Sequence, residues 1–240
     1  MRFLLIGNGK MGKLIASTAQ AAGDEIAAVF SRENLQDLAS WDGGADVVID
    51  FSGPQTLDAV CDYIRRTGTP LLSGTTGYTP EEKARLLELG DCAPVLWSAN
   101  YSIGVAVFYR LLRQISDTLK PDFDIEMTET HHNQKADAPS GTAKLLLQAI
   151  DPEGEYTPVY GREGACGKRG PKEIGVHALR GGTVAGTHTV HFFGPDEELE
   201  ITHRAASRQI FVNGALSMAR RMVGKPNGVY DLQTLLFGEG

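Results

Sequence analysis

The sequence has no excess of basic residues: 23 lysines and arginines stand against 30 aspartates and glutamates, for a formal net charge of −7. Nucleic acids and anionic membrane surfaces are bound by basic faces. The balance therefore argues against nucleic acid and against a membrane surface as partners. It does not exclude a small anionic ligand, because a local group of donors outweighs an acidic average.

Long apolar runs are also missing. No stretch approaches the ~20 apolar residues that cross a bilayer, so we expect no membrane-spanning segment. The N-terminal run Met1–Ile6 carries one basic residue and is followed at once by glycine. That is not the pattern of a signal peptide, and we expect a cytoplasmic protein.

Cysteine is scarce. The three cysteines, Cys61, Cys92 and Cys166, are odd in number and far apart, and no two form a C-x-x-C pair. This pattern favours reduced thiols over a disulfide framework or a thiolate zinc site. We expect no resident metal.

What the first hundred residues do have is an alternation of short apolar runs with amphipathic stretches. Pro54–Thr67 places apolar residues on one helical face, and Thr79 with Glu82 predicts a capping box before a helix that Gly90 ends. The alternation predicts a parallel sheet that binds ligands at the carboxyl ends of its strands. The expected strands are Phe3–Ile6, Ile26–Phe30, Val47–Phe51, Pro70–Leu72 and Pro94–Trp97.

The pattern changes after residue 102. Phe123, Ile125 and Met127 alternate with polar residues, as in a strand with one polar face. Further expected elements are helices at Ile103–Leu119, Gly141–Ile150 and Gly214–Val223, strands at Ile174–Leu179, Thr187–Phe193 and Leu199–Ala205, a turn at Gly194–Asp196 and a mobile loop at Gly161–Lys172. The predicted fold class is α/β, with a Rossmann-type dinucleotide-binding domain at residues 1–102 and 213–240. An α+β substrate domain with a mixed sheet is expected at residues 103–212.

The first motif is Gly7-Asn8-Gly9-Lys10-Met11-Gly12, a G-x-G-x-x-G pattern between an expected strand and an expected helix. In that context the first glycine permits the tight turn, the second admits a pyrophosphate, and the third lets helix and strand pack closely. The helix N-terminus then supplies N–H donors to the phosphates. The alternative is a structural glycine turn.

The end of the second expected strand bears on cofactor choice. An NAD site usually has an acidic residue there for the ribose 2′-hydroxyl, whereas this chain has Ser31 and Arg32, with Glu33 one place later. Arg32 and Lys10 are suited to hold a 2′-phosphate. We therefore favour NADPH and keep NADH open. The alternative is that both cations are solvated surface residues.

Three loops at the carboxyl ends of later strands carry small and polar residues. They are Asp50-Phe51-Ser52-Gly53, Gly74-Thr75-Thr76-Gly77 and Ser98-Ala99-Asn100-Tyr101. Each by itself is typical of a turn, but their shared position favours contact with the nicotinamide half of the cofactor.

The most specific segment is Glu129-Thr130-His131-His132-Asn133-Gln134-Lys135-Ala136-Asp137-Ala138-Pro139-Ser140-Gly141-Thr142. Imidazole is the side chain best suited to proton transfer near neutrality, and Lys135 adds a positive charge or a proton. The N–H groups of Gly141 and Thr142 can hold a carboxylate at a helix N-terminus. Ser140 caps that helix, binds substrate, or does both.

Arg180 belongs to a third cluster, Arg180-Gly181-Gly182-Thr183, followed by Gly186 and His188. The arginine is a candidate to meet a second carboxylate or a neighbouring subunit. A glycine hairpin is an equally supported alternative.

These residues together resemble the 4-hydroxy-tetrahydrodipicolinate reductase family, also called dihydrodipicolinate reductase. The resemblance spans essentially the whole chain, and E-x-H-H-x-x-K-x-D-A-P-S-G-T is unbroken from Glu129 to Thr142. It implies an enzyme that reduces a cyclic imine dicarboxylate with NADH or NADPH, in the diaminopimelate branch of lysine biosynthesis. It also implies a homotetramer formed through the sheet of the C-terminal domain.

By motif position, the resemblance makes His131 the acid–base residue and Lys135 its proton-donating partner. His132, Gly141 and Thr142 would bind substrate, and Gly74–Thr76 with Ser98–Tyr101 would line the cofactor. The chain departs from many members in its G-x-G-x-x-G loop and in Ser31, where an acidic residue is common. Both departures concern cofactor preference and leave the chemistry untouched.

Two rival functions differ in their requirements. Another nicotinamide-dependent dehydrogenase of amino-acid metabolism would lack the His-His-x-x-Lys…Ser-Gly-Thr arrangement. A non-catalytic dinucleotide sensor would keep Gly7–Gly12 but have no use for Lys135 beside paired histidines.

Overall fold

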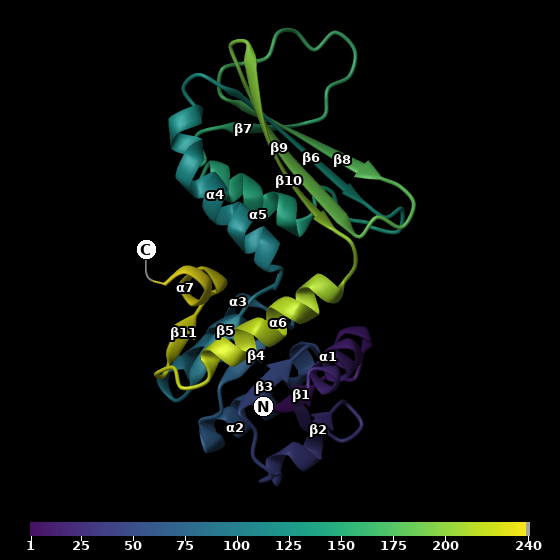
Figure 1. Ribbon diagram of the computed structural model, residues 1–240, viewed down its shortest axis with the longest axis vertical. Coiled ribbons are helices and arrows are strands. Elements are labelled where there is room, and N and C mark those ends of the chain that lie inside the picture. The colour runs from purple at the N-terminus through teal and green to yellow at the C-terminus, as the bar shows by residue number, and fades with distance from the viewer. Residues whose placement is uncertain (239–240) are drawn as a thin grey trace. The chain divides into compact units, whose positions relative to one another are not determined.

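The computed structural model describes residues 1–238, and the chain divides into two compact units (Figure 1). One unit comprises Met1–Ile103 and the chain from Gln209 onward, and the other comprises Gly104–Arg208. The chain thus enters the second unit once and returns once. Within the described residues, no helix is long and apolar enough to cross a membrane.

The first unit is built on six parallel strands in the order β11-β5-β4-β3-β1-β2. The strands are β1 (Arg2–Ile6), β2 (Glu25–Phe30), β3 (Val47–Asp50), β4 (Leu71–Ser73), β5 (Pro94–Trp97) and β11 (Gly228–Tyr230). The predicted Rossmann-type parallel sheet is confirmed. Because β1 lies between β2 and β3, the winding reverses at the β1–β3 pair, which is where such sheets bind ligands.

The first unit has five α-helices within the described residues. They are α1 (Lys10–Ala21), α2 (Leu57–Thr67), α3 (Pro80–Leu87), α6 (Gln209–Met222) and α7 (Leu232–Phe237). The capping box of Thr79 and Glu82 is present at α3. The role predicted for Gly90 is wrong: α3 ends at Leu87, a 3-10 turn runs on to Asp91, and a Cβ on Gly90 would meet Val229 of β11.

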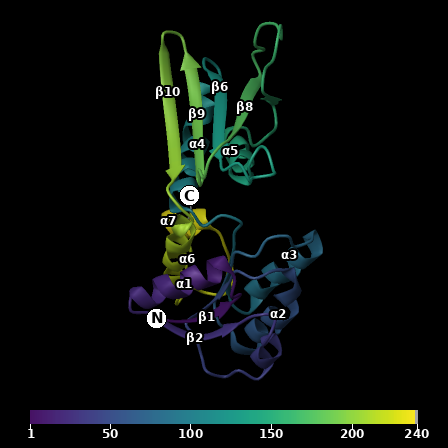
Figure 2. The ribbon, with the colours of Figure 1, turned by 90° about the vertical axis from the view of Figure 1, so that its right-hand side faces the viewer.

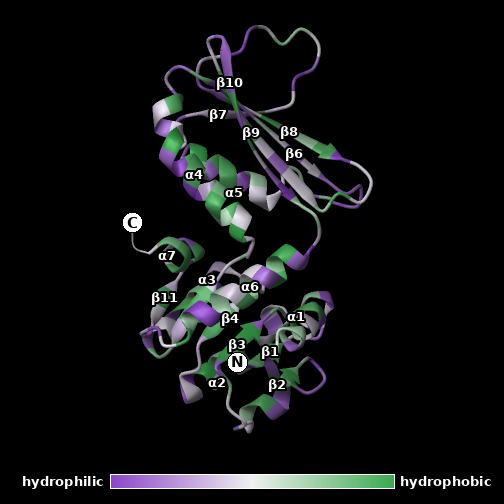
Figure 3. Ribbon diagram, viewed as in Figure 1, coloured by the Kyte–Doolittle hydropathy of each residue, from purple (hydrophilic) through white to green (hydrophobic). Residues whose placement is uncertain are grey.

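The second unit has a mixed sheet in the order β10-β9-β6-β8-β7, as predicted. Its strands are β6 (Asp124–His131), β7 (Thr157–Tyr160), β8 (Glu173–Arg180), β9 (Gly186–Gly194) and β10 (Glu197–Ala205). The helices α4 (Ile103–Leu119) and α5 (Gly141–Ile150) lie on one face of it (Figures 1 and 2). Phe108, Leu112 and Leu146 from these helices pack on Ile125 and Met127 of β6. The alternating hydropathy of α4 in Figure 3 reflects this one-sided burial.

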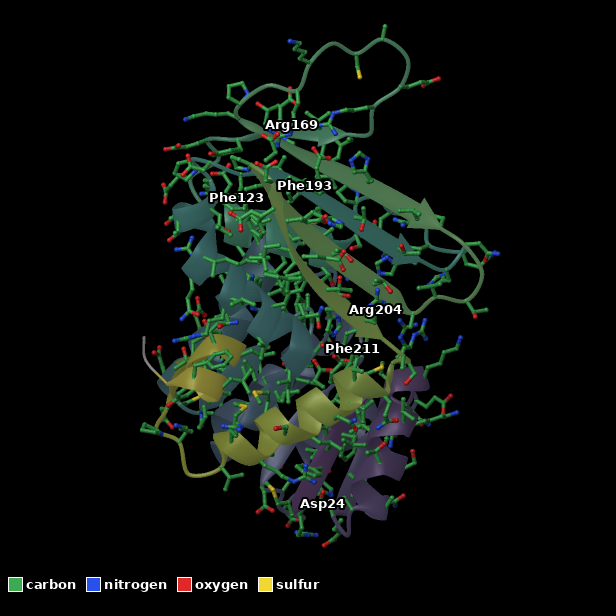
Figure 4. The ribbon with its side chains drawn as sticks, turned by 45° about the horizontal axis from the view of Figure 1, so that its top comes forward. Asp24, Phe123, Arg169, Phe193, Arg204 and Phe211 are labelled. Carbon is green, nitrogen blue, oxygen red and sulfur yellow. The ribbon has the colours of Figure 1, made fainter. Side chains whose placement is uncertain are left out.

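The stretch Gly161–Lys172 forms a loop, as predicted, but two of its arginines bond to the sheet. Arg162 makes a bidentate ion pair with Glu126, and both N–O distances are 2.9 Å. Arg169, labelled in Figure 4, bonds Asp124 at 2.6 Å and the Ile125 carbonyl at 3.2 Å. The loop is therefore anchored to β6 at two points.

Several elements differ from the sequence prediction, mostly short ones whose packing partners are distant in the sequence. The sequence patterns missed β7, β11 and α7, and placed the start of α6 at Gly214 instead of Gln209. The Arg180–Thr183 segment is not a hairpin, because β6 lies between β8 and β9. The segment crosses the end of β6, where the Gly181 N–H donates to the His131 carbonyl at 2.9 Å.

Candidate active site

The three glycines of the first motif differ in what surrounds them. A Cβ on Gly7, where φ is +108°, would collide with the Phe51 carbonyl, and one on Gly12 would collide with the Gly7 carbonyl. A Cβ on Gly9, the N-cap residue of α1, would meet nothing within 4 Å. Packing of the chain on itself therefore explains Gly7 and Gly12. Gly9 instead leaves open space beside a helix N-terminus, where an anionic ligand is stabilised.

A cavity of about 450 Å³ opens at the carboxyl ends of β1, β2 and β3. Its lining residues are Gly7, Asn8, Gly9, Lys13, Ser31, Arg32, Glu33, Phe51, Ser52, Gln55 and Thr56. Five of the predicted cofactor residues are among them, and the cavity lies at the place that the strand order indicates. Lys10, Met11 and Gly12 are not in its lining.

The cations that line this cavity differ from the predicted pair, Arg32 and Lys10. Arg32 lines it, and the Gln55 amide, with its oxygen turned toward the guanidinium, lies 2.8 Å from both Nε and Nη2. Lys13, one helical turn beyond Lys10, lines it as well. Ser31 is engaged with Asn34, whose Oδ1 accepts the Ser31 N–H at 2.8 Å. Arg32 and Lys13 are thus the two cations of the site.

A buried carboxylate, Asp50, joins the predicted cofactor loops to one another. Its oxygens accept bonds from the Ser52 hydroxyl, from the Ser73 hydroxyl at 2.9 Å and from the Ser52 N–H at 3.1 Å. The Ser52 N–H also donates to Thr75 at 3.0 Å. Burial raises the pKa of Asp50, although these neutral donors oppose the rise.

The later loops are held by their own side chains. Tyr101, almost fully buried, donates its hydroxyl to the Ser73 carbonyl at 2.7 Å. Thr75 is also buried, and its carbonyl accepts from the Trp97 indole at 2.8 Å. These side chains fix the loops, so contact with a cofactor falls to the loop backbones and the remaining side chains. The predicted cofactor residues outside the cavity lining are Lys10, Met11, Gly12, Gly74, Thr75, Thr76, Ser98, Ala99, Asn100 and Tyr101.

In the second unit, Glu129 and His131 both lie on the buried face of β6. Nδ1 of His131 is 2.6 Å from Oε2 of Glu129. The Glu129 carboxylate also accepts two bonds from Arg180, each at 2.8 Å, and the Ser140 N–H at 3.0 Å. Burial by itself raises the pKa of Glu129, but hydrogen bonds from Arg180 and His131 outweigh it and hold the pKa below its usual value.

The histidine that faces His131 is His188, not its sequence neighbour His132. The rings of His131 and His188 are 5.1 Å apart and meet edge to face. Burial lowers the pKa of His188 to about 4, with a smaller contribution from His131. His188 is therefore neutral at neutral pH, while His132 lies in the loop after β6.

Ser140 is the N-cap of α5, as predicted. Its hydroxyl accepts the Ala143 N–H at 3.1 Å and lies 2.9 Å from Nε2 of His188. The residue is almost fully buried, so its hydroxyl serves the cap and His188. Gly141 and Thr142 follow as the first two residues of the helix, and a Cβ on Gly141 would meet nothing within 4 Å.

Two predicted cations are engaged in ion pairs. Nζ of Lys135 lies 2.7 Å from Asp137, and this contact holds the pKa of the Asp137 carboxyl below its usual value. Arg180, expected to meet a substrate carboxylate, bonds Glu129 and the Asp137 carbonyl instead. Its geometry favours a role in holding Glu129 over direct contact with a ligand.

The sequence patterns gave no individual role to Glu129, Asp50 or Lys13, and they placed His188 only in the cluster with Arg180. One of these was within reach of the sequence, because the inward alternation of Ile125 and Met127 continues by twos to Glu129 and His131. His188 was not, because β9 comes beside β6 only through tertiary pairing.

Two family models match the chain over nearly its whole length. The model described as "Dihydrodipicolinate reductase, N-terminus" matches residues 1–101, and "Dihydrodipicolinate reductase, C-terminus" matches residues 104–236. Together they cover both units.

Curated relatives agree with the family models. The 4-hydroxy-tetrahydrodipicolinate reductase of Staphylococcus aureus (strain Newman) is 43% identical over 244 residues, which cover 98% of this chain and 100% of the relative. The enzyme of the same name from an Exiguobacterium species is 42% identical over 241 residues, covering 98% and 95%.

Solved structures share the fold. The dipicolinate-bound dihydrodipicolinate reductase from Paenisporosarcina sp. TG-14 superposes with a TM-score of 0.78 at 21% identity, covering 99% of both chains. The NAD(H)-bound scyllo-inositol dehydrogenase from Lactobacillus casei gives a TM-score of 0.55 at 12% identity, covering 93% of this chain and 88% of the other.

Proposed function

Because the chain belongs to the dihydrodipicolinate reductase family, we propose that it reduces 4-hydroxy-tetrahydrodipicolinate, through the cyclic imine dicarboxylate, to tetrahydrodipicolinate on the diaminopimelate route to lysine. The observation that carries this proposal is the unbroken Glu129–Thr142 segment. Its buried residues Glu129, His131 and Ser140 form one hydrogen-bonded cluster beside the N-terminus of α5. The protein is an oxidoreductase, as its relatives are.

The first unit fits a nicotinamide dinucleotide. Gly9 leaves open space at the N-terminus of α1, and the cavity continues to the ends of β2 and β3. The backbone of Gly7–Gly12 would hold the pyrophosphate, and the loops Gly74–Thr76 and Ser98–Tyr101 would border the nicotinamide half. When bound, the reduced nicotinamide supplies a hydride to the substrate ring.

NADPH is the cofactor we favour. Arg32, just after β2, and Lys13 of α1 give the cavity two positive charges, and Ser31 follows β2 where an NAD site has an acidic residue. Gln55 orients the Arg32 guanidinium. Glu33 also lines the cavity, which keeps NADH as the alternative.

The side chains of the second unit bind the dicarboxylate and deliver a proton. His131 exchanges that proton, and Lys135 places a positive charge that stabilises the developing charge on the ring nitrogen. The N–H groups of Gly141 and Thr142 hold a substrate carboxylate at the start of α5, with His132 as a further donor. Neutral His188 leaves the exchangeable positive charge to His131.

We propose a homotetramer, and its support is the face of the second sheet that carries no helix. Inward residues of β6 and β9 pack on α4 and α5, whereas the alternate residues face away from them. Leu179 and Phe193 on that side are 49% and 40% exposed. Phe193 and Arg204 of this face are labelled in Figure 4. A second copy of the chain packed on this face would cover these two side chains.

The test is a coupled assay in which the substrate is generated enzymatically and the loss of reduced-nicotinamide absorbance is followed with NADPH and with NADH. Turnover with either cofactor supports the reductase. No loss of absorbance with either cofactor, combined with tight NADPH binding, would instead support a dinucleotide sensor. Sedimentation of the same preparation tests the tetramer.

A further inference from the structure

Glu129 lies at the centre of the acid–base cluster and is not exposed to solvent. It is fully buried, and its two oxygens contact three different elements: His131 of β6, Arg180 of β8 and the Ser140 N–H at the start of α5. A buried carboxylate is tolerated only when it is paired and hydrogen-bonded. Arg180 provides both the charge and two of the bonds.

The charge of Glu129 determines which ring nitrogen of His131 carries a hydrogen when the ring is neutral. Hydrogen bonds from Arg180 and His131 keep the pKa of Glu129 low despite its burial, so the group is ionised and only accepts hydrogen bonds. Nδ1 of His131, 2.6 Å away, must then carry a hydrogen in either charge state of the ring. The proton that His131 exchanges is consequently the one on Nε2.

Gly186 lies close to Nε2 of His131. A Cβ built on this glycine would be 3.1 Å from that nitrogen. A side chain at Gly186 would therefore crowd the atom that exchanges the proton.

Resting on the proposed function, we infer that Glu129 is a positioning residue for the reduction: held by Arg180, it fixes His131 in the tautomer that presents Nε2 to the reaction. A carboxylate behind an imidazole serves the same purpose in unrelated hydrolases, where it holds the ring in one tautomer and stabilises the imidazolium. Here the carboxylate is two residues before the histidine on the same face of one strand.

The charged and titratable groups around His131 come from several elements. They are Glu129 on β6, Arg180 on β8, His188 on β9, His203 beside His188 on β10, and Lys135 with Asp137 on the loop after β6. Burial lowers the pKa values of both His188 and His203. Glu129 is the group in direct contact with the His131 ring nitrogen.

The test uses the full-length protein and three variants. Glu129→Gln removes the charge at constant shape, and its amide can donate to Nδ1 and select the wrong tautomer. Glu129→Asp keeps the charge on a shorter side chain. Glu126→Gln is the matched control: it lies on the opposite face of β6, and its carboxylate also contacts a histidine, His177 at 2.8 Å, and two arginines.

The first readout is the tautomer of His131, taken from its imidazole ¹⁵N shifts in the absence of substrate. We expect a hydrogen on Nδ1 in the wild type, Glu129→Asp and Glu126→Gln, and its loss from Nδ1 in Glu129→Gln. The second is the pH profile of kcat. We expect Glu129→Gln to lose at least ~10²-fold in kcat and to move its alkaline limb to lower pH, because the imidazolium loses its carboxylate. Glu129→Asp should lie between, and Glu126→Gln should match the wild type.

A wild-type His131 protonated on Nε2 alone would overturn the inference without any variant, and so would a Glu129→Gln enzyme with the wild-type profile. If Glu129→Gln does not fold, Glu129→Asp takes its place, and wild-type kcat with an Nε2–H tautomer would be decisive against the inference. A wild type that reduces no substrate, yet has the Nδ1–H tautomer, would overturn the proposed function alone.

Discussion

Each unit of the molecule buries a carboxylate beside its candidate site, and the pKa values of these two groups are shifted in opposite directions. Asp50 receives bonds only from neutral donors, and burial raises its pKa. Glu129 is bonded by the Arg180 guanidinium, and its pKa is lowered in spite of its burial. Burial raises the pKa of both carboxylates, and the difference shows that hydrogen bonds from a nearby cation can reverse the direction of that shift.

The two settings suit two tasks. Asp50 joins loops after β3 and β4 through Ser52, Ser73 and Thr75, which requires hydrogen bonds but no firm charge. Glu129 faces the imidazole that we propose exchanges a proton, a role that requires a charge that persists. The comparison thus parallels the proposed division between a cofactor-binding unit and a proton-transferring unit.

The strongest test of that separation removes the proton-transfer groups. His131→Ala and Lys135→Ala should each lose at least ~10²-fold in kcat, while the NADPH dissociation constant stays unchanged, because neither residue lines the cavity of the first unit. Steady-state kinetics and fluorescence titration measure the two quantities. Lys144→Ala, on the exposed side of α5, is the control. Near-normal turnover would remove the altered residue from the mechanism.

The next test deprives Glu129 of its cation. Arg180→Met leaves a buried carboxylate without its arginine partner and should lower the free energy of unfolding by about 3–5 kcal/mol. Arg162→Met, which leaves Glu126 with Arg169 and His177, should lower it by less than about 1 kcal/mol. Urea unfolding at neutral pH compares the two. Equal losses of unfolding free energy in the two variants would contradict the expectation that Glu129, which is fully buried, depends more on its arginine than Glu126 does.

The pH dependence of stability should have opposite signs at the two carboxylates. The raised pKa of Asp50 means that its stabilising effect is present below the unfolded value, about 3.9, and is lost as pH rises through the folded value. The lowered pKa of Glu129 means that its effect is present above about 4.3 and is lost as pH falls through the folded value.

As pH rises, Asp50→Asn should therefore become more stable relative to the wild type. Over the acidic range, Glu129→Gln should become less stable relative to the wild type as pH rises. Urea unfolding at a series of pH values measures both slopes. Slopes of the same sign would show that burial dominates at both sites.

The smallest effect concerns the cofactor alone. Arg32→Ser should weaken NADPH binding about tenfold, the equivalent of one charge-assisted contact, and leave NADH binding unchanged. Arg65→Ser, an exposed cation of α2 outside the cavity, should change neither. Titration with both cofactors measures the two affinities. Equal losses of affinity for NADPH and NADH would show that Arg32 does not contact the 2′-phosphate.

Much of the fold could be predicted because its determinants are local. The helices at Ile103–Leu119 and Gly141–Ile150 have the predicted bounds, and the Thr79 capping box forms as predicted, because side chains three to four residues apart decide both. The short elements β7, β11 and α7 have no such pattern. β7 and β11 exist because they pair with β8 and β5.

The candidate site divides along the same line. The sequence by itself determined the glycine loop, the Glu129–Thr142 segment and the buried alternation that carries Glu129 and His131, because spacing along one strand or one turn decides these. Only the tertiary structure decided their partners. Arg180 reaches Glu129 across 51 residues and His188 reaches Ser140 across 48. Lys13, and not Lys10, lines the cavity of the first unit. The charge state of a buried group depends on whatever folding places against it, which no local pattern contains.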